Sequence, residues 1–162
     1  MAEASLRAAR PSRRGGLPNA LFVVAAAEHP PSEMNAIAAE VTILFPWGSL
    51  LRGALARDDA CDATAGIASL VAPGGVVRTL LSIDPRDRLS VPVPAAGDAA
   101  DLAARWARHG LSLTAFERTG PADIDASGSS WAHRLAAGRD RQVWRLELRR
   151  TEESIGETDR DR

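Results

Sequence analysis

Short apolar runs alternate with amphipathic stretches along most of this chain, and the two periods predict its elements. Runs rich in β-branched and aromatic residues, too short for buried helices, predict strands at residues 21–25, 41–45, 76–83, 111–118 and 141–149. Helical spacing predicts helices at residues 2–9, 49–57, from 58 or 59 to 71, and 98–109. Strands that alternate with helices favour an α/β domain with a largely parallel sheet, and the two late strands favour an antiparallel hairpin at its edge.

The connections follow from proline, glycine and polar residues. Ser49 is positioned to cap the helix that follows the second strand, and residues 72–75 form a turn before the third. Residues 85–97, with little periodicity, predict a loop, and residues 120–128 predict a polar connection.

Composition narrows the class of protein. The 162 residues, 45% hydrophobic and 25% charged, suit one ordinary globular domain. The single Cys61 excludes an internal disulfide framework and a cysteine zinc site, and His29 and His133 lack the partner spacing of a metal site. With neither a membrane-length apolar stretch nor a secretory signal visible, the expected location is the cytoplasm.

Charge is unevenly distributed, although the net charge is only −1. There is no Lys, so all 20 basic residues are Arg, which a GC-rich coding bias explains in large part. Arginines are dense from Arg134 to Arg150, and an acidic tail that we expect to be disordered follows at residues 151–162. This asymmetry points to a polyanionic partner, while a solvated charged strand explains the charge equally well.

Trp47 is the first candidate for binding chemistry. It follows the second predicted strand, and ligands of α/β sheets bind just outside the carboxyl ends of the strands. A flat indole there suits a planar ligand, whereas core filling is the more common use of Trp. Trp106, on the apolar face of a helix, and Trp144, inside a strand pattern, fit core filling and are left out of the site.

Three separated motifs resemble one enzyme family. They are Gly15-Gly16-Leu17-Pro18-Asn19-Ala20-Leu21-Phe22 with Ala27-Glu28, then Phe45-Pro46-Trp47-Gly48-Ser49-Leu50-Leu51, then Ser130-Trp131-Ala132-His133-Arg134-Leu135 with Arg139-Asp140-Arg141. In this order they resemble the aminoglycoside-resistance 16S ribosomal RNA methyltransferases of the KamB and NpmA type. The resemblance covers most of residues 2–150, with residues 84–100 poorly matched.

The resemblance implies a class I, Rossmann-like methyltransferase fold and an activity. The family transfers a methyl group from S-adenosylmethionine to N1 of adenine 1408 of 16S rRNA in the small (30S) ribosomal subunit, which gives aminoglycoside resistance. We expect a monomer with this RNA as partner, no membrane and no metal.

The resemblance also implies the site. Trp47 and Trp131 correspond to two rings that sandwich the flipped adenine, with Pro46 and Ser129 as supporting residues. Ala27 and Glu28 correspond to positions beside the cofactor adenine, and Leu44, Phe45 and Ser49 to positions near its methionine end and the target base. Arg134, Arg139 and Arg141 correspond to arginines that touch RNA phosphates or support the Trp131 loop. Without the resemblance, Glu28 is equally well read as a helix-capping carboxylate.

The chain departs from the family at its front. By the resemblance, residues 1–150 are the C-terminal two-thirds of the fold, without the glycine-rich turn and the acidic residue that hold the cofactor. We therefore expect weak cofactor binding and a hydrophobic gap in the sheet. A mis-assigned start codon is the favoured explanation and gene decay the next. The alternative function is a non-catalytic remnant that binds RNA or is inactive, and a methyltransferase for another RNA is a third possibility.

Overall fold

The sheet is the frame of this computed structural model, which describes residues 2–87, 91–135 and 141–152. Four strands, β1 (Ala38–Leu44), β2 (Val71–Leu81), β3 (Leu111–Arg118) and β4 (Trp144–Arg150), lie in the order β1-β2-β4-β3. β1 and β2 are parallel, whereas β4 is antiparallel to both β2 and β3. The α/β class is confirmed and so is the late antiparallel pair, but the expectation of a largely parallel sheet is wrong for the described residues.

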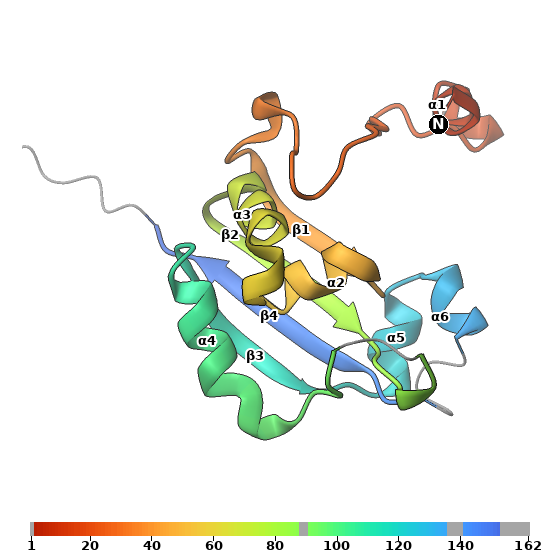
Figure 1. Ribbon diagram of the computed structural model, residues 1–162. Coiled ribbons are helices and arrows are strands. Elements are labelled where there is room, and N and C mark those ends of the chain that lie inside the picture. Colours follow the sequence, from red (N-terminus) through yellow and green to blue (C-terminus); the bar gives the residue numbers. More distant parts are fainter. Residues whose placement is uncertain (1, 88–90, 136–140, 153–162) are drawn as a thin grey trace, which may run out of the picture.

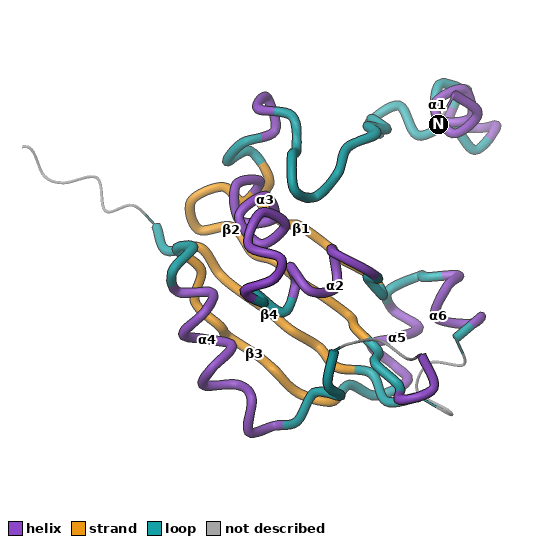
Figure 2. The backbone as a smooth tube through the Cα atoms, viewed as in Figure 1, coloured by secondary structure: helices purple, strands orange, loops and turns teal. Residues whose placement is uncertain are grey.

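Helices cover one face of this sheet. They are α2 (Gly48–Ala54), α3 (Cys61–Leu70) and α4 (Ala99–Ala107), as Figure 1 shows. α1 (Ala2–Ala8) lies apart at the end of an N-terminal arm, and α5 (Pro121–Ala126) and α6 (Ser130–Arg134) lie at the end of the sheet where β2 finishes (Figures 1 and 2). Both short helices fall where the sequence predicted only a polar connection and a loop. None of the described helices is long and apolar enough to cross a bilayer.

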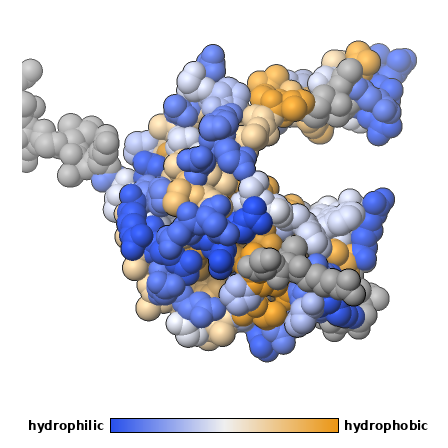
Figure 3. All heavy atoms as spheres, in the orientation of Figure 1, coloured by the Kyte–Doolittle hydropathy of each residue, from blue (hydrophilic) through white to orange (hydrophobic). Residues whose placement is uncertain are grey.

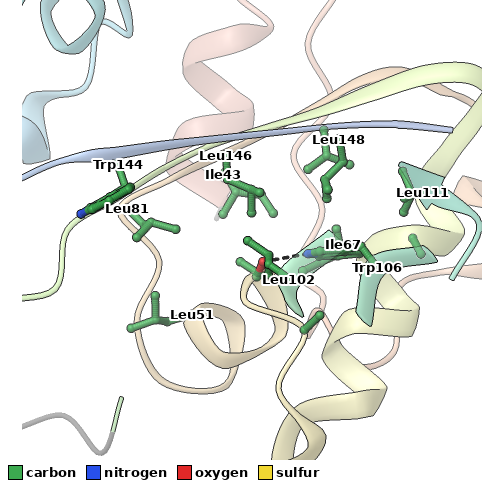
Figure 4. Close-up of a cluster of buried hydrophobic side chains, with 14 of the residues drawn as sticks. Ile43, Leu51, Ile67, Leu81, Leu102, Trp106, Leu111, Trp144, Leu146 and Leu148 are labelled. Carbon is green, nitrogen blue, oxygen red and sulfur yellow. Dashed lines mark hydrogen bonds between the residues drawn. The ribbon is translucent and has the colours of Figure 1, made fainter. Parts of the chain in front are cut away.

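The main core lies between the helices and the sheet. Trp106 is fully buried in it, and its indole N–H donates to the carbonyl of Ala54 at 3.2 Å (Figure 4). Trp144 is also buried and stacks on Phe116, with ring centroids 4.9 Å apart. Both tryptophans therefore fill the core, as the sequence predicted.

The opposite face of the sheet carries charge. Arg78 of β2 pairs with Glu40 of β1 and with Glu147 of β4, and Arg145 of β4 pairs with Glu147 and with Glu117 of β3. Exposed ion pairs of this kind stabilise a fold only weakly, but they show that this face is suited to water.

The predicted strand at residues 21–25 is wrong. Residues 21–25 belong to no helix or strand, and an isolated bridge between Ala26 and His29 follows them. Leu21 and Val24 are 87% and 77% exposed. A strand needs a neighbour to pair with its N–H and C=O groups, and the described residues supply none for this run.

Other element boundaries differ by small amounts. α3 begins at Cys61 because residues Asp58–Ala60 form a turn of 3-10 helix. β2 begins at Val71 and takes in the predicted turn, where Gly74 has φ +72°. Ser49 does not cap α2, because the capping position falls on Trp47 and carries no side-chain hydrogen bond.

Candidate functional site

The turn from β1 into α2 is built around two left-handed residues. Phe45 has φ +50° and donates its backbone N–H to the carbonyl of Leu80 at 2.7 Å, and Gly48 has φ +60°. A bulky residue in this region is strained, and such strain persists only where the surroundings hold it. Pro46 is buried between them, whereas the side chain of Trp47 is 42% exposed. The turn therefore presents an indole at the carboxyl end of an α/β strand.

The second predicted ring is also open to solvent. Trp131 in α6 is 43% exposed, and the guanidinium of Arg134 lies over its ring, 5.9 Å from the centroid. The Ser129 hydroxyl accepts a hydrogen bond from the backbone N–H of Ala132 at 3.4 Å, at the start of the helix that carries Trp131. Ser129 thus contacts the residue next to Trp131.

A small buried cluster brings the two segments together. Its members are Phe45, Leu80, Ile124, Ala132 and Val143, with Leu135 packed against them. Phe45 is two residues from Trp47, and Ala132 is next to Trp131. The cluster is separate from the main core. Two motifs more than 80 positions apart therefore share one end of the sheet, with both indoles on the outside of the packing that joins them.

The turn that holds Ala27 and Glu28 sits on α3 and beside α2. A Cβ built on Gly66 of α3 would lie 1.8 Å from the Ala27 carbonyl oxygen, so only glycine permits this approach. The Ser49 hydroxyl donates a hydrogen bond to the Glu28 carboxylate. This bond is the main reason that the pKa of Glu28 is lowered, and the backbone N–H of Glu28 and the charge of Arg52 lower it further.

Three of the residues that the resemblance assigns to the cofactor, Ala27, Glu28 and Ser49, thus lie close together near the start of α2. A cavity of about 290 Å³ lies beside Glu28 and Ser49 and is lined otherwise by residues 58–63. Leu44 is partly exposed at the end of β1, but the Phe45 side chain is buried in the small cluster and offers only its backbone to a ligand. These residues fit one wall of a cofactor site. The described residues hold no glycine-rich strand-to-helix turn to form the opposite wall.

The predicted arginines differ in their surroundings. Arg134 is exposed beside Trp131, and Arg139 lies outside the described residues. Arg141 is largely buried, where it forms an ion pair with Asp87 and donates to the Ser82 hydroxyl at 3.3 Å. Neither partner belongs to the Trp131 segment, so both roles that the resemblance implies for Arg141 stay predictions.

Sequence reasoning missed several residues that shape this end of the molecule. Asp87 stands in a stretch without periodicity, Ser82 follows a strand, and Ile124 belongs to an unpredicted helix. No local signal marks them, because their partners are about 54 to 60 positions away or lie in the small cluster. Within the described ranges, no group of three or more His, Cys, Asp or Glu is placed to hold a metal ion.

Comparisons with known proteins show to which family the chain is similar. A curated rRNA methyltransferase of Saccharopolyspora hirsuta is 36% identical over 143 residues, which cover 83% of this chain and 88% of that protein. A 16S rRNA (adenine(1408)-N(1))-methyltransferase of Streptoalloteichus hindustanus is 33% identical over 150 residues, which cover 87% of this chain and 66% of that protein. The chain therefore spans just under two thirds of that enzyme's length.

Solved structures confirm the fold. A 16S rRNA (adenine(1408)-N(1))-methyltransferase from Catenulisporales acidiphilia, determined as a mutant with its cosubstrate S-adenosylmethionine, superposes with a TM-score of 0.79 at 27% identity. The match covers 95% of this chain and 71% of that one. The family profile described as NpmA, 16S rRNA (adenine(1408)-N(1))-methyltransferase, matches residues 1–150. This chain belongs to the NpmA family of 16S rRNA (adenine(1408)-N(1))-methyltransferases.

Proposed function

We propose that this chain carries the target-base half of an enzyme that methylates N1 of adenine 1408 in 16S rRNA, within the 30S subunit in the cytoplasm. The observation that supports this most directly is the pair of exposed indoles, Trp47 and Trp131, on segments joined by one buried cluster. Family membership supports the substrate and the methyl donor, S-adenosylmethionine. Aminoglycoside resistance is the expected consequence.

The reaction first requires that the adenine leave its helix, because its N1 is inside the stack. Extruding a base costs a few kcal/mol, and stacking on an aromatic ring returns about 1–3 kcal/mol per base. Trp47 and Trp131 are the residues for this stacking. Their mounting on a strained turn and a short helix, held by Phe45 and Ala132, limits the positions that the two rings adopt.

The chemical step then depends on orientation. The cofactor supplies an electrophilic methyl group on a sulfonium, so the N1–CH₃ bond forms as the S–CH₃ bond breaks. Neutral adenine offers a free in-plane lone pair at N1, and no proton has to be removed before attack. The chain's residues therefore act by holding the adenine ring with its N1 in line with the methyl group. Such orientation of the reacting atoms can account for a large part of the lowering of an activation barrier. The methylated ring is cationic, and indole faces stabilise a cation.

Arg134 and Arg141 complete the proposed site. Arg134 is exposed beside Trp131 and is available to an RNA phosphate. Arg141, held by Asp87 and Ser82, is assigned the support of Trp131 that the resemblance implies. Ala27, Glu28, Leu44 and Ser49, with the backbone of Phe45, are the proposed contacts to the cofactor.

The test is methylation of purified 30S subunits, read by primer extension at adenine 1408. Trp47→Ala and Trp131→Ala should each lower the rate about ten- to hundred-fold, since each removes one stacking surface. Affinity for S-adenosylmethionine, measured by calorimetry, should remain nearly unchanged.

Val93→Ala is the control, because Val93 is an exposed apolar residue outside the proposed site. An equal loss of cofactor affinity in both tryptophan variants would refute the division of roles. Absence of methylation by the unmodified chain would refute the proposed function for this chain and favour the alternative, a non-catalytic remnant.

A further inference from the structure

A buried ion pair lies at the end of the sheet that carries both exposed indoles. The guanidinium of Arg141 pairs with the carboxylate of Asp87, and their side chains are only 12% and 8% exposed. Hydrophilic side chains cover much of the face drawn in Figure 3, where water solvates them. A charge that is removed from water is costly unless it is paired, so each member of the buried pair requires the other.

Asp87 also closes the turn to which it belongs. Its carboxylate accepts a hydrogen bond from the backbone N–H of Asp84 at 3.1 Å, in addition to the bond from the guanidinium of Arg141. Asp84 and Asp87 follow β2, whereas Arg141 comes shortly before β4. Asp87 therefore joins two segments that are more than 50 positions apart in the sequence.

Ser82, the first residue after β2, makes a second connection to the same place. Its hydroxyl accepts a hydrogen bond from Nε of Arg141 at 3.3 Å and donates one to the backbone carbonyl of Gln142 at 2.9 Å. Two adjacent residues before β4 are therefore held to the end of β2, one by its side chain and one by its backbone.

Residues 141–143, the return leg, lead from the Trp131 segment into β4. Val143 at the end of the return leg is buried in the small cluster, and its carbonyl accepts a hydrogen bond from the backbone N–H of Thr119 at 2.9 Å. The same cluster holds Ala132, the neighbour of Trp131. A displacement of the return leg would therefore disturb the packing beneath Trp131.

We propose that Asp87 is a positioning residue for Trp131. By pairing with Arg141 it fixes the return leg, and through the return leg it fixes the ring that stacks on the target adenine. A buried ion pair adds little net stability compared with apolar contacts of similar volume, but its hydrogen bonds are satisfied in one geometry only. The role of the ring rests on the proposed function, whereas the coupling between Asp87 and Trp131 is independent of it.

The test is fluorine-19 NMR of the full chain labelled with 5-fluorotryptophan, which gives a resonance for each of its four tryptophans. Asp87→Asn keeps the volume of the side chain and removes its charge. It should shift and broaden the resonance of Trp131, assigned with Trp131→Phe, and leave the resonance of Trp106 in the main core unchanged. Equal displacement of both resonances would mean that Asp87 only stabilises the whole fold, and would overturn the proposal.

Ser82→Ala is a milder second variant, because it removes the other connection to the return leg without leaving a buried charge unpaired. It should shift the Trp131 resonance in the same direction by a smaller amount, and it serves as the test if Asp87→Asn does not fold. Asp101→Asn is the matched control, because it breaks an ion pair with Arg105 inside α4 and should leave the Trp131 resonance unchanged. A Trp131 resonance that stays in place in the folded Asp87 and Ser82 variants would overturn the proposal.

Affinity for purified 30S subunits, measured by sedimentation, connects the position of the ring with function. Asp87→Asn should weaken binding about ten-fold, within the free energy of one base stack, and Asp101→Asn should leave it unchanged. Full affinity in Asp87→Asn together with weak binding by Trp131→Ala would overturn the positioning role. Full affinity in Trp131→Ala would instead count against the proposed function, and a shifted Trp131 resonance in Asp87→Asn would then still support the coupling.

Discussion

Two apolar runs of similar composition have opposite fates in this molecule. Val41–Leu44 forms the last four residues of β1, pairs with β2 and buries Ile43 in the main core. Leu21–Val24 has four large apolar side chains, one more than Val41–Leu44, but forms no strand and remains exposed. The difference lies in their neighbours, since β2 runs beside one run and no described strand runs beside the other.

The comparison shows that an apolar, β-branched run forms a strand only where a neighbouring strand and a buried face are available. A β-branched run fits a pleated, half-buried surface, and without that surface little free energy favours its strand conformation. The segments that follow the two runs nevertheless meet, since the Glu28 carboxylate accepts a hydrogen bond from the Ser49 hydroxyl. Substitutions in and beside the two runs measure how differently the runs are packed and how firmly the segments that follow them are joined.

The largest effect is expected from matched truncations in the two runs. Ile43→Ala should lower the free energy of unfolding by about 2–5 kcal/mol, because it leaves a cavity under the sheet. Leu21→Ala should change it by less than about 0.5 kcal/mol, because the side chain is already in water. Urea denaturation followed by circular dichroism measures both. Comparable losses of stability in the two variants would show that the run Leu21–Val24 is packed in solution.

A smaller effect is expected at the contact between Gly66 of α3 and the turn that follows Leu21–Val24. Gly66→Ala places a methyl group against the Ala27 carbonyl and should cost about 1–3 kcal/mol of stability through forced movement of the turn. Gly97→Ala is the matched control, because a Cβ there meets nothing within 4 Å. Equal melting temperatures for the two variants would mean that the turn does not rest on α3.

The smallest effect is expected in the titration of Glu28. Its lowered pKa means that the folded state favours the carboxylate. The contact with Ser49 therefore stabilises the fold above the unfolded pKa of about 4.3 and is lost as pH falls through the folded value. Ser49→Ala should raise the pKa of Glu28 towards the ordinary value, as measured by carbon-13 NMR of the carboxyl group. An unchanged pKa would place the turn away from α2.

The sequence supported much of the fold and the outline of the site. The strands at β1, β2, β3 and β4 and the core roles of Trp106 and Trp144 were all recognisable, because burial on a strand or helix face leaves a periodic pattern. Trp47 was recognisable by its place after a strand. The roles assigned to Trp131 and the arginines came from the resemblance alone, and those roles stay predictions.

Other features had no local signal. The pairing of Arg141 with Asp87 and the packing of Ile124 near Phe45 join residues far apart in the chain. The helices α5 and α6 are too short for a reliable period, and their form depends on the cluster beneath them.

The sequence by itself determined which segments have an apolar face, which residues interrupt them and which family motifs the chain carries. Those properties depend on the order of side chains alone. Only the tertiary structure decided that β4 inserts between β2 and β3, that the Phe45 side chain turns inward while Trp47 stays outside, and that Leu21–Val24 forms no strand. Each of these depends on which neighbour is present to satisfy a backbone or cover a side chain, and neighbours in space are set by the whole fold.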